Sequence, residues 1–270
     1  MCGGYSMVKI NQVIDIMEEI APLNLKESYD NVGFMVGDRE SEVTRVLVAL
    51  DCTLKVIEEA KELGAQLILT HHPLLFIKPK SITTDSLQGK KIMKLIENGI
   101  ALYSSHTNWD TVKGGLNDEF VKLLGFEESK IIEVAPSDPT AGVGRIVQLS
   151  EHTTVERIIN RIKDKLNLQN LRYSGELDKK VRTISLVNGS GEDYLQQSYD
   201  LGADLLITGD TTYHFVSDYE EMGLSVIDIG HFNSEWPLVM SLAENIKKIL
   251  EPMGVEVILS KVIKDPYNFI

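Results

Sequence analysis

Apolar residues along this chain follow two different spacings, and stretches of each kind alternate. Between residues 10 and 20 an apolar residue recurs every three or four positions, which predicts one face of a helix, and Pro22 marks its end. Arg45–Leu50 instead contains five consecutive apolar residues, which is typical of a strand covered on both faces of its sheet. The pattern therefore predicts helices that alternate with buried strands.

The stretch from Arg45 to Thr70 predicts a strand–helix–strand unit. A helix follows the first strand, with Asp51 or Thr53 as its N-terminal cap and Gly64 at its C-terminal end. A second short apolar strand ends at Thr70. A strand, a helix and a second strand within about thirty residues form a βαβ unit.

More elements of the same two kinds complete the first half. We predict a helix through Ile92 and Ile96 that Gly99 closes, a strand over Ile100–Ser104, and a helix that opens at Gly114-Gly115 and ends at Gly125. Strands that alternate with helices in this way predict an α/β fold.

The second half of the chain repeats the first. A shift of 138 residues places Leu63–Thr70 on Leu201–Thr208 without a gap, and five of the eight positions are identical. The same shift places the strand Arg45–Leu50 on Thr183–Asn188. A period of this length indicates a duplicated lobe rather than a solenoid. We therefore predict one unit made of two repeats, residues 7–128 and 129–270.

Two adjacent histidines, His71 and His72, follow the strand that ends at Thr70, and Pro73 stops that strand. Neighbouring residues of a strand point to opposite faces, so two imidazoles converge only where the strand gives way to a turn. Imidazoles at such a strand end suit a metal ion or a proton transfer. The alternative is a pair of surface histidines in a loop.

Each repeat also carries a segment of the form His-x-Asn-x-acid after a strand, His106–Asp110 and His231–Glu235. Open α/β sheets bind ligands at the carboxyl ends of their strands, so we expect these segments at one shared crevice. Three imidazoles and two carboxylates suit two divalent ions better than one. The five predicted metal ligands are His71, His72, Asp110, His231 and Glu235.

Glu235 is the residue that we expect to bridge the two ions. Pro237 follows it, and apolar residues at helical spacing come next. Glu235 is therefore expected at or just before a helix N-terminus, with Pro237 in the first turn. Imidazole and carboxylate accept Zn, Fe and Mn alike, so the residues do not identify the metal.

Three further polar residues are candidates for acid–base roles beside the metals. Asp210 lies in the second repeat where His72 and its neighbours lie in the first, and His214 follows four residues later. Both could hold a ligand in place or carry a proton. Asp210 could instead cap the helix that begins near Tyr213. His106 is either close to the metals or a structural histidine.

Composition limits the possible classes of protein. The net charge of -13 repels phosphate backbones, which disfavours general binding of nucleic acid. Two cysteines, Cys2 and Cys52, are too few for a disulfide framework and are compatible with a reducing compartment. The chain has no run of 18 apolar residues and no signal-peptide core at its start, so the expectation is a soluble, cytoplasmic protein without a membrane partner.

Six motifs occur in an order that resembles a known family. They are Tyr29–Gly33, Thr70–Pro73, His106–Asp110, Gly114–Asp118, Thr208–His214 and Gly230–Glu235. Together they are similar to the dinuclear-metal-centre hexameric proteins, the NIF-three-like family whose members are often named type-2 GTP cyclohydrolase I homologues. The resemblance spans roughly residues 8–262. Members commonly have Trp where this chain has Tyr29.

The resemblance implies two intertwined α/β repeats with mixed sheets, a toroidal homo-hexamer, and metal sites that face an inner cavity. Its motifs match the same five metal ligands. Three functions stay open. The first is a hydrolase whose metal-activated water attacks a nucleotide or related small substrate, with His214, Asp210 or His106 moving protons. The second is a metal-handling protein without turnover, and the third is a ring-shaped interaction module.

Overall fold

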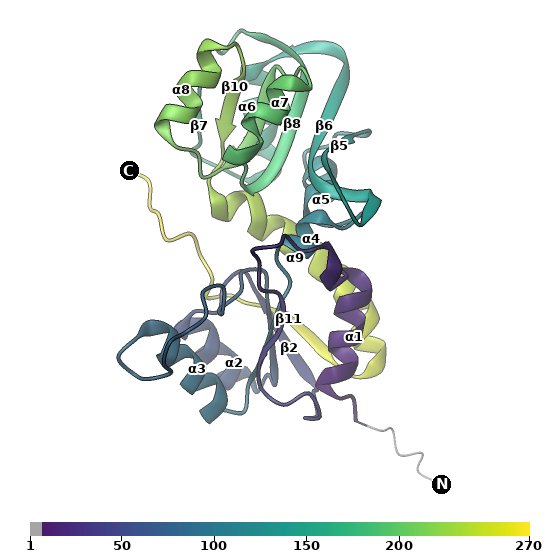
Figure 1. The fold of residues 1–270 in the computed structure, drawn as a ribbon, viewed down its shortest axis with the longest axis vertical. Coiled ribbons are helices and arrows are strands. Elements are labelled where there is room, and N and C mark those ends of the chain that lie inside the picture. Colours follow the sequence, from purple (N-terminus) through teal and green to yellow (C-terminus); the bar gives the residue numbers. More distant parts are fainter. Residues whose placement is uncertain (1–6) are drawn as a thin grey trace. The chain divides into compact units, whose positions relative to one another are not determined.

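The structure is a computed structural model that describes residues 7–270, and Cys2 lies outside the described residues. The chain divides into two compact units. The first unit comprises Met1–Trp109, described from Met7 on, together with Val239–Lys264, and the second comprises Asp110–Leu238 with Asp265–Ile270. Each unit is built on one sheet (Figure 1). The predicted repeat boundaries, 7–128 and 129–270, divide the sequence into its two repeats rather than into these spatial units, and they stay a prediction.

The sheet of the first unit has the strand order β1-β4-β3-β2-β11. Its inner strands run parallel, and only β1 is antiparallel to its neighbour. The elements of this unit are α1 (Ile10–Ile20), η1 (Leu23–Leu25), β1 (Gly33–Val36), β2 (Arg45–Ala49), α2 (Leu54–Leu63), β3 (Leu67–Thr70), α3 (Leu87–Glu97), β4 (Ala101–Ser104), η3 (Glu251–Met253) and β11 (Glu256–Leu259). The helix predicted over residues 10–20 is confirmed.

Helices cover both faces of this sheet, which explains its unbroken apolar strands. Leu47 and Ile68 pack with α2 and α3 in one core cluster. Figure 1 shows α1 on the other side of β2 and β11 from α2 and α3. All four residues of β3 are buried, as expected for a parallel strand between two helical layers.

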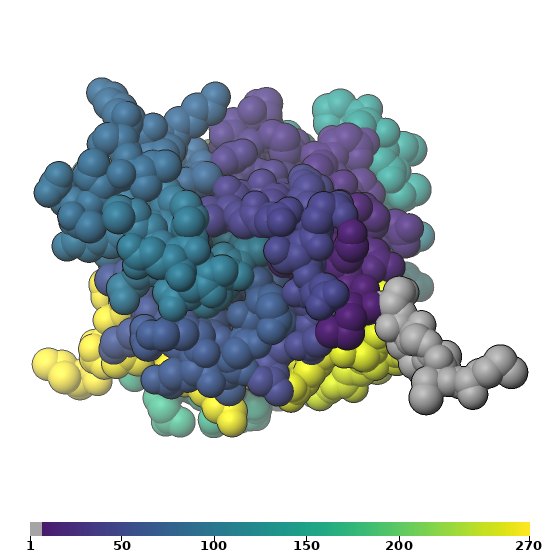
Figure 2. Space-filling view, turned by 90° about the horizontal axis from the view of Figure 1, so that it is seen from below, coloured from purple at the N-terminus to yellow at the C-terminus, as the bar shows by residue number. Residues whose placement is uncertain are grey.

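The C-terminal part of the chain returns to this unit. β11 pairs in parallel with β2, with Val257 beside Val46. In Figure 2 the yellow C-terminal residues accordingly lie beside purple and blue residues of the N-terminal part. The buried carboxylate of Glu59 on α2 holds the end of this return, because it accepts hydrogen bonds from the Ser260 hydroxyl and the Lys261 N–H.

The sheet of the second unit has the strand order β5-β6-β8-β9-β10-β7. Strands β8, β9 and β10 run parallel, and the other three pair antiparallel. Its elements are α5 (Leu116–Leu123), β5 (Lys130–Ala135), β6 (Asp138–Thr154), α6 (Val155–Leu166), β7 (Arg172–Tyr173), β8 (Lys180–Ser190), η2 (Glu192–Tyr194), α7 (Leu195–Asp200), β9 (Leu205–Gly209), α8 (Tyr213–Glu221) and β10 (Ser225–Asp228). Two helices, α4 (Thr107–Thr111) and α9 (His231–Leu250), continue from one unit into the other.

The strand registers of the two sheets repeat each other. Val46 of β2 lies opposite Leu67 of β3, and Ile184 of β8 lies opposite Leu205 of β9, so a shift of 138 residues carries one pair onto the other. In both sheets an antiparallel edge strand, β1 or β7, flanks the third parallel strand. The α/β fold with two mixed sheets is confirmed, and these registers agree with the predicted duplication.

Candidate metal site

The first part of the candidate site is the turn that follows β3. The Thr70 hydroxyl lies 2.7 Å from the Ser104 hydroxyl and donates to the His72 carbonyl, while the His72 N–H donates to the Leu50 carbonyl. At His71 these hydrogen bonds end the regular alternation of side chains between the two faces of the sheet. The two imidazoles therefore lie together, with ring centroids 5.2 Å apart. The alternative of a pair of surface histidines in a loop is wrong for His71, because His71 is fully buried.

His106 joins this pair from the segment after β4. Its ring centroid lies 5.1 Å from that of His71 and 5.6 Å from that of His72. Each of the three imidazoles offers one nitrogen, and these nitrogens lie within 4.8 Å of one another, close enough to hold a metal ion. The first unit thus contains a three-histidine cluster, and His106 belongs to it.

In each ring of this cluster, Nδ1 contacts an oxygen of the protein. The distances from Nδ1 are 2.9 Å to the Ser105 carbonyl for His71, 2.9 Å to Asp51 for His72 and 2.9 Å to Asp30 for His106. A metal-binding histidine characteristically uses its second ring nitrogen in this way, which fixes the tautomer and the ring orientation. With Nδ1 engaged in this way, Nε2 is the ring nitrogen that suits a cation or, in His106, a proton transfer.

Asp30 stays ionised although it is buried. Burial on its own raises the pKa of Asp30, but hydrogen bonds from His106 and Thr107 outweigh burial and lower that pKa from 3.8 to about 2. Thr107 contributes both its N–H and its hydroxyl, at 3.1 and 2.6 Å. A carboxylate held this firmly fixes the orientation of the His106 ring.

The second unit carries the remaining predicted ligands. His231 and Glu235 are four residues apart on α9, and His231 Nε2 lies 3.0 Å from a Glu235 oxygen. His231 Nδ1 lies 2.7 Å from Asp210. Glu235 is only 3% exposed, and a Cβ added to Gly189 would lie 2.3 Å from its Oε1. The Glu235 carboxylate therefore fills the space that a glycine leaves open.

Asp110 lies on α4 and is tied to the same strand end of this unit. The Asn188 side chain donates to Asp110 Oδ1 at 2.7 Å, and Asn117 donates to the Asp110 carbonyl. Asn188 directly precedes Gly189, so the end of β8 contacts both predicted carboxylate ligands. The structure thus divides the five predicted ligands, with His71 and His72 in the first unit and Asp110, His231 and Glu235 in the second.

The predicted position of Glu235 at a helix N-terminus is wrong. The helix α9 begins at His231, four residues earlier, and Pro237 lies inside it rather than in its first turn. Gly230 has a φ of +83°, and its N–H donates to Asp228, which starts the helix sooner than the proline suggested. The earlier start places His231 and Glu235 on one face of the helix, because residues four apart are neighbours there.

The other two predicted catalytic residues differ in their surroundings. Asp210 is not the cap of α8: Thr212 precedes that helix without a side-chain cap, and Asp210 contacts His231 instead. His214 is exposed on the first turn of α8, where its ring packs edge-on against Tyr213. Among the described residues, His214 belongs to no cluster that could hold a metal ion.

Sequence reasoning missed two of the groups that hold the histidines. The sequence offers Asp51 only as a helix cap, but in the structure Thr53 caps α2 and Asp51 contacts His72. Asp30 is the acidic residue of the Tyr29–Gly33 motif, and the sequence assigns it no role, although it holds a histidine of the cluster. Donor and acceptor types alone do not reveal such pairs, since the partners are far apart in the chain.

The histidine and carboxylate donors fit a divalent transition metal, which commonly binds imidazole nitrogen and carboxylate oxygen. No helix among residues 7–270 combines the length and apolar character that crossing a membrane requires. Fold and site together define a two-unit α/β protein with a three-histidine cluster in the first unit and a pair formed by His231 and Glu235 in the second.

Comparison with known proteins identifies the family. The family described as Duf34/NIF3 (NGG1p interacting factor 3) matches residues 8–266, and the chain belongs to it. A relative from Clostridium perfringens (strain 13 / Type A), named GTP cyclohydrolase 1 type 2 homolog, is 59% identical over 97% of this chain and 100% of its own length.

Two solved structures share the fold. The Staphylococcus aureus protein SA1388 has a TM-score of 0.86 and 31% identity, and the match covers 97% of this chain and 99% of that one. A Bacillus cereus protein related to NIF3 has a TM-score of 0.90 at 24% identity, over 98% of this chain and 100% of that one. The second likeness concerns the fold alone.

Proposed function

We propose that this protein is a metal-dependent hydrolase that binds two divalent ions per chain. The proposed ligands are His71, His72, Asp110, His231 and Glu235. The observation that carries the proposal is the cluster of His71, His72 and His106, in which an oxygen holds Nδ1 of every ring. Rings oriented in this way are prepared for a cation before it arrives.

Divalent ions bound at these residues would supply Lewis-acid activation of water and of the substrate. The protein's own acid–base chemistry is assigned to the pair formed by Asp30 and His106. The ionised Asp30 carboxylate accepts the Nδ1 proton of His106 and keeps Nε2 available as a proton acceptor. In the second unit Asp210 orients His231. His214, exposed beside Tyr213, is the second proposed proton carrier.

The proposed substrate class is a nucleotide or a related small molecule. It is supported by the name of the Clostridium perfringens relative, GTP cyclohydrolase 1 type 2 homolog. The homo-hexameric assembly, the absence of nucleic-acid and membrane partners, and the cytoplasmic location stay predictions from the sequence.

Elemental analysis of protein purified without chelators, followed by a turnover screen on nucleotides, tests the proposal. We expect two ions per chain and turnover that stops when a chelator removes them. His71→Ala should lose metal and keep its fold, since each sheet has its own apolar core. One ion per chain in fully metallated protein would contradict the dinuclear site, and unfolding of His71→Ala would make the histidine structural.

His106→Ala separates the two roles open to that residue. As a proton carrier, His106 can be removed with loss of turnover while the metal content stays at that of the wild type. If the variant loses metal to the same extent as His71→Ala, His106 is a ligand and the general base lies elsewhere. Full metal content without turnover on any nucleotide would favour the metal-handling protein over the hydrolase.

A further inference from the structure

The end of strand β8 departs from the regular pairing of its sheet. β8 has three residues between the pairs that Leu186 and Ser190 form with β9. β9 has only one residue between the matching partners, Ile207 and Gly209. The excess makes a β-bulge, and Asn188 is one of the residues within it. Bulges of this kind are frequent beside functional sites, where they redirect a side chain.

Side chains from other elements hold the backbone of this bulge. The Asn188 N–H donates to Asn117 Oδ1 at 3.4 Å, and the Gly189 N–H donates to the Ser234 hydroxyl at 2.9 Å. The Thr208 hydroxyl of β9 donates to the Gly189 carbonyl at 3.2 Å. Gly189 has the positive φ of +63° that suits a glycine. The bulge is therefore a fixed feature of the fold, with hydrogen bonds to α5, α9 and β9.

The Asn188 side chain contacts a candidate metal ligand. Its amide nitrogen Nδ2 donates to Asp110 Oδ1 at 2.7 Å. Among residues 7–270 no other hydrogen bond uses this side chain, and its carbonyl oxygen Oδ1 is buried without a donor. Because a carboxylate accepts hydrogen bonds and donates none, the atom that faces Asp110 is the nitrogen, and the carbonyl is left unpaired.

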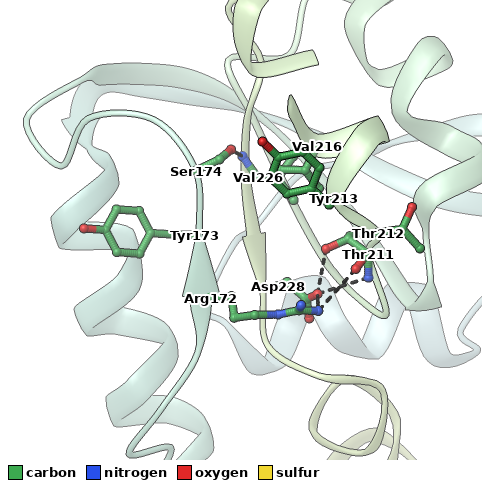
Figure 3. A pocket seen from close by; sticks show the side chains of 9 residues that line it. All are labelled: Arg172, Tyr173, Ser174, Thr211, Thr212, Tyr213, Val216, Val226 and Asp228. Atoms are coloured by element: carbon green, nitrogen blue, oxygen red, sulfur yellow. Dashed lines mark hydrogen bonds and ion pairs between the residues drawn. The ribbon is translucent and has the colours of Figure 1, made fainter. Parts of the chain in front are cut away.

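The unpaired carbonyl makes Asn188 an unfavourable residue for stability alone, because a buried polar atom without a partner destabilises the folded state. Figure 3 shows the usual arrangement at the end of β10 in the same sheet. There the buried Asp228 carboxylate, in the lining of a pocket, accepts hydrogen bonds from Thr211 and Arg172. It also accepts the Gly230 N–H, so both of its oxygens have partners. Exceptions to this rule are expected at functional sites.

The first repeat indicates that this strand end does not need an amide. The shift of 138 residues that relates the two sheets places Leu50 on Asn188. Leu50 directly follows β2 and is only 2% exposed, so an apolar side chain is well buried at the matching position. The amide is therefore specific to the strand end beside Asp110.

We propose that Asn188 is a positioning residue of the candidate metal site, and that its amide nitrogen holds the Asp110 carboxylate ready for a cation. A ligand that is oriented in advance loses less freedom when the cation binds, which favours binding. The same bulge contains Gly189, and the Glu235 carboxylate occupies the space that this glycine leaves open. One feature of the backbone thus serves both carboxylates. This role of Asn188 rests on the proposed function, in which Asp110 binds a metal ion.

Two variants test this role through the affinity for Zn²⁺, measured by competition with a coloured chelator. Asn188→Leu introduces the residue type of the first repeat, and Asn188→Ala removes the amide without adding bulk. Both should weaken Zn²⁺ binding about 10- to 100-fold, the usual effect of losing a group that holds a metal ligand. Asn188→Leu should change the melting temperature of chelator-treated protein by less than about 4 °C, because it also removes an unpaired carbonyl.

Two further measurements separate positioning from a general structural effect. Asp110→Ala should also weaken Zn²⁺ binding. Adding Asn188→Ala to that variant should change the affinity less than about twofold, because the two residues act through one group. With Co²⁺ as the bound ion, Asn188→Ala should shift the visible absorption bands toward those of Asp110→Ala.

Ser185→Ala is the matched control. Ser185 is buried on the same strand, and among residues 7–270 its hydroxyl also lacks a hydrogen-bond partner. The variant should therefore bind Zn²⁺ like the wild type.

The outcomes distinguish the positioning role from the proposed function. Wild-type Zn²⁺ affinity in both Asn188 variants, an equal loss in Ser185→Ala, or additive losses in the double variant would each overturn the positioning role alone. Losses that depend on Asp110, in a protein that turns over no nucleotide, would support the positioning role and contradict only the hydrolase. Failure of the wild type to bind Zn²⁺ would overturn both.

Discussion

Replacing Asp51 with alanine should weaken metal binding without unfolding the protein. Asp51 lies 2.9 Å from His72 Nδ1, and its side chain is 45% exposed, while that of His72 is 23% exposed. The Asp51 carboxylate therefore orients the His72 ring from the edge of the site rather than supporting a core. Its loss frees the ring to rotate and removes the acceptor that raises the basicity of Nε2.

The magnitude follows from these contacts. Loss of such an outer partner typically costs 10- to 100-fold in metal affinity, which corresponds to about 1.4–2.7 kcal/mol. The same change should alter the stability of the metal-free protein by less than about 1 kcal/mol, because exposed ion pairs contribute little. The metal dissociation constant should thus rise while the melting temperature of the chelator-treated protein stays nearly constant.

A competition titration against a coloured chelator measures this affinity, and thermal unfolding of the metal-free protein measures the stability. Asp85→Ala is the matched control, because it removes an equal charge from an exposed position of the same unit. Wild-type affinity in Asp51→Ala would refute the role of His72 as an oriented ligand. An equal loss in Asp85→Ala would assign the effect to net charge instead.

Three further variants test other parts of the structure. Gly189→Ala should displace the Glu235 carboxylate and weaken metal binding. Gly202 has a similar positive φ but nothing within 4 Å of an added Cβ, so Gly202→Ala should only lower stability. Equal metal affinities of the two variants would contradict this prediction. Glu235→Gln should weaken both ions together in a metal titration, whereas wild-type affinity would place the bridge at Asp110. Burial raises the pKa of Asp118, but the hydrogen bond and charge of Arg145 outweigh burial and lower that pKa. The ionised Asp118 therefore stabilises the fold at pH values above its ordinary pKa near 4, and this contribution is lost as the pH falls through the lowered pKa. Asp118→Asn should therefore lower the free energy of unfolding in urea at pH 7 by about 3–5 kcal/mol, because Arg145 is buried. If the difference in stability between variant and wild type did not narrow below about pH 4, this role of the Asp118 charge would be refuted.

Local rules were sufficient for most of the secondary structure. The apolar spacing of residues 10–20 and the glycine at position 64 mark a helix face and a helix end in the structure as well. Such patterns follow from the fixed geometry of helices and strands, and they need no knowledge of distant contacts. They fail at α9, because the sequence places the proline in the first turn of this helix, whereas the structure places it in the helix interior.

The repeated strand register explains why several candidate residues could be placed at strand ends from the sequence. One shift of the sequence aligns strand with strand, and the structure repeats the register along with the residues. The carboxyl ends of the parallel strands then had to carry the polar segments that follow them. The sequence by itself therefore determined the α/β class, the repeated succession of strands and helices, and the residue types at the strand ends.

Only the tertiary structure decided how those residues are held. The carboxylates that contact Nδ1 of His72, His106 and His231 lie 21, 76 and 21 residues away in the chain. Hydrogen bonds of this kind depend on where loops from different strands meet, which no local pattern encodes. The ionised state of the buried Asp30 likewise exists only after folding, because it results from a balance between burial and the donors that surround the carboxylate.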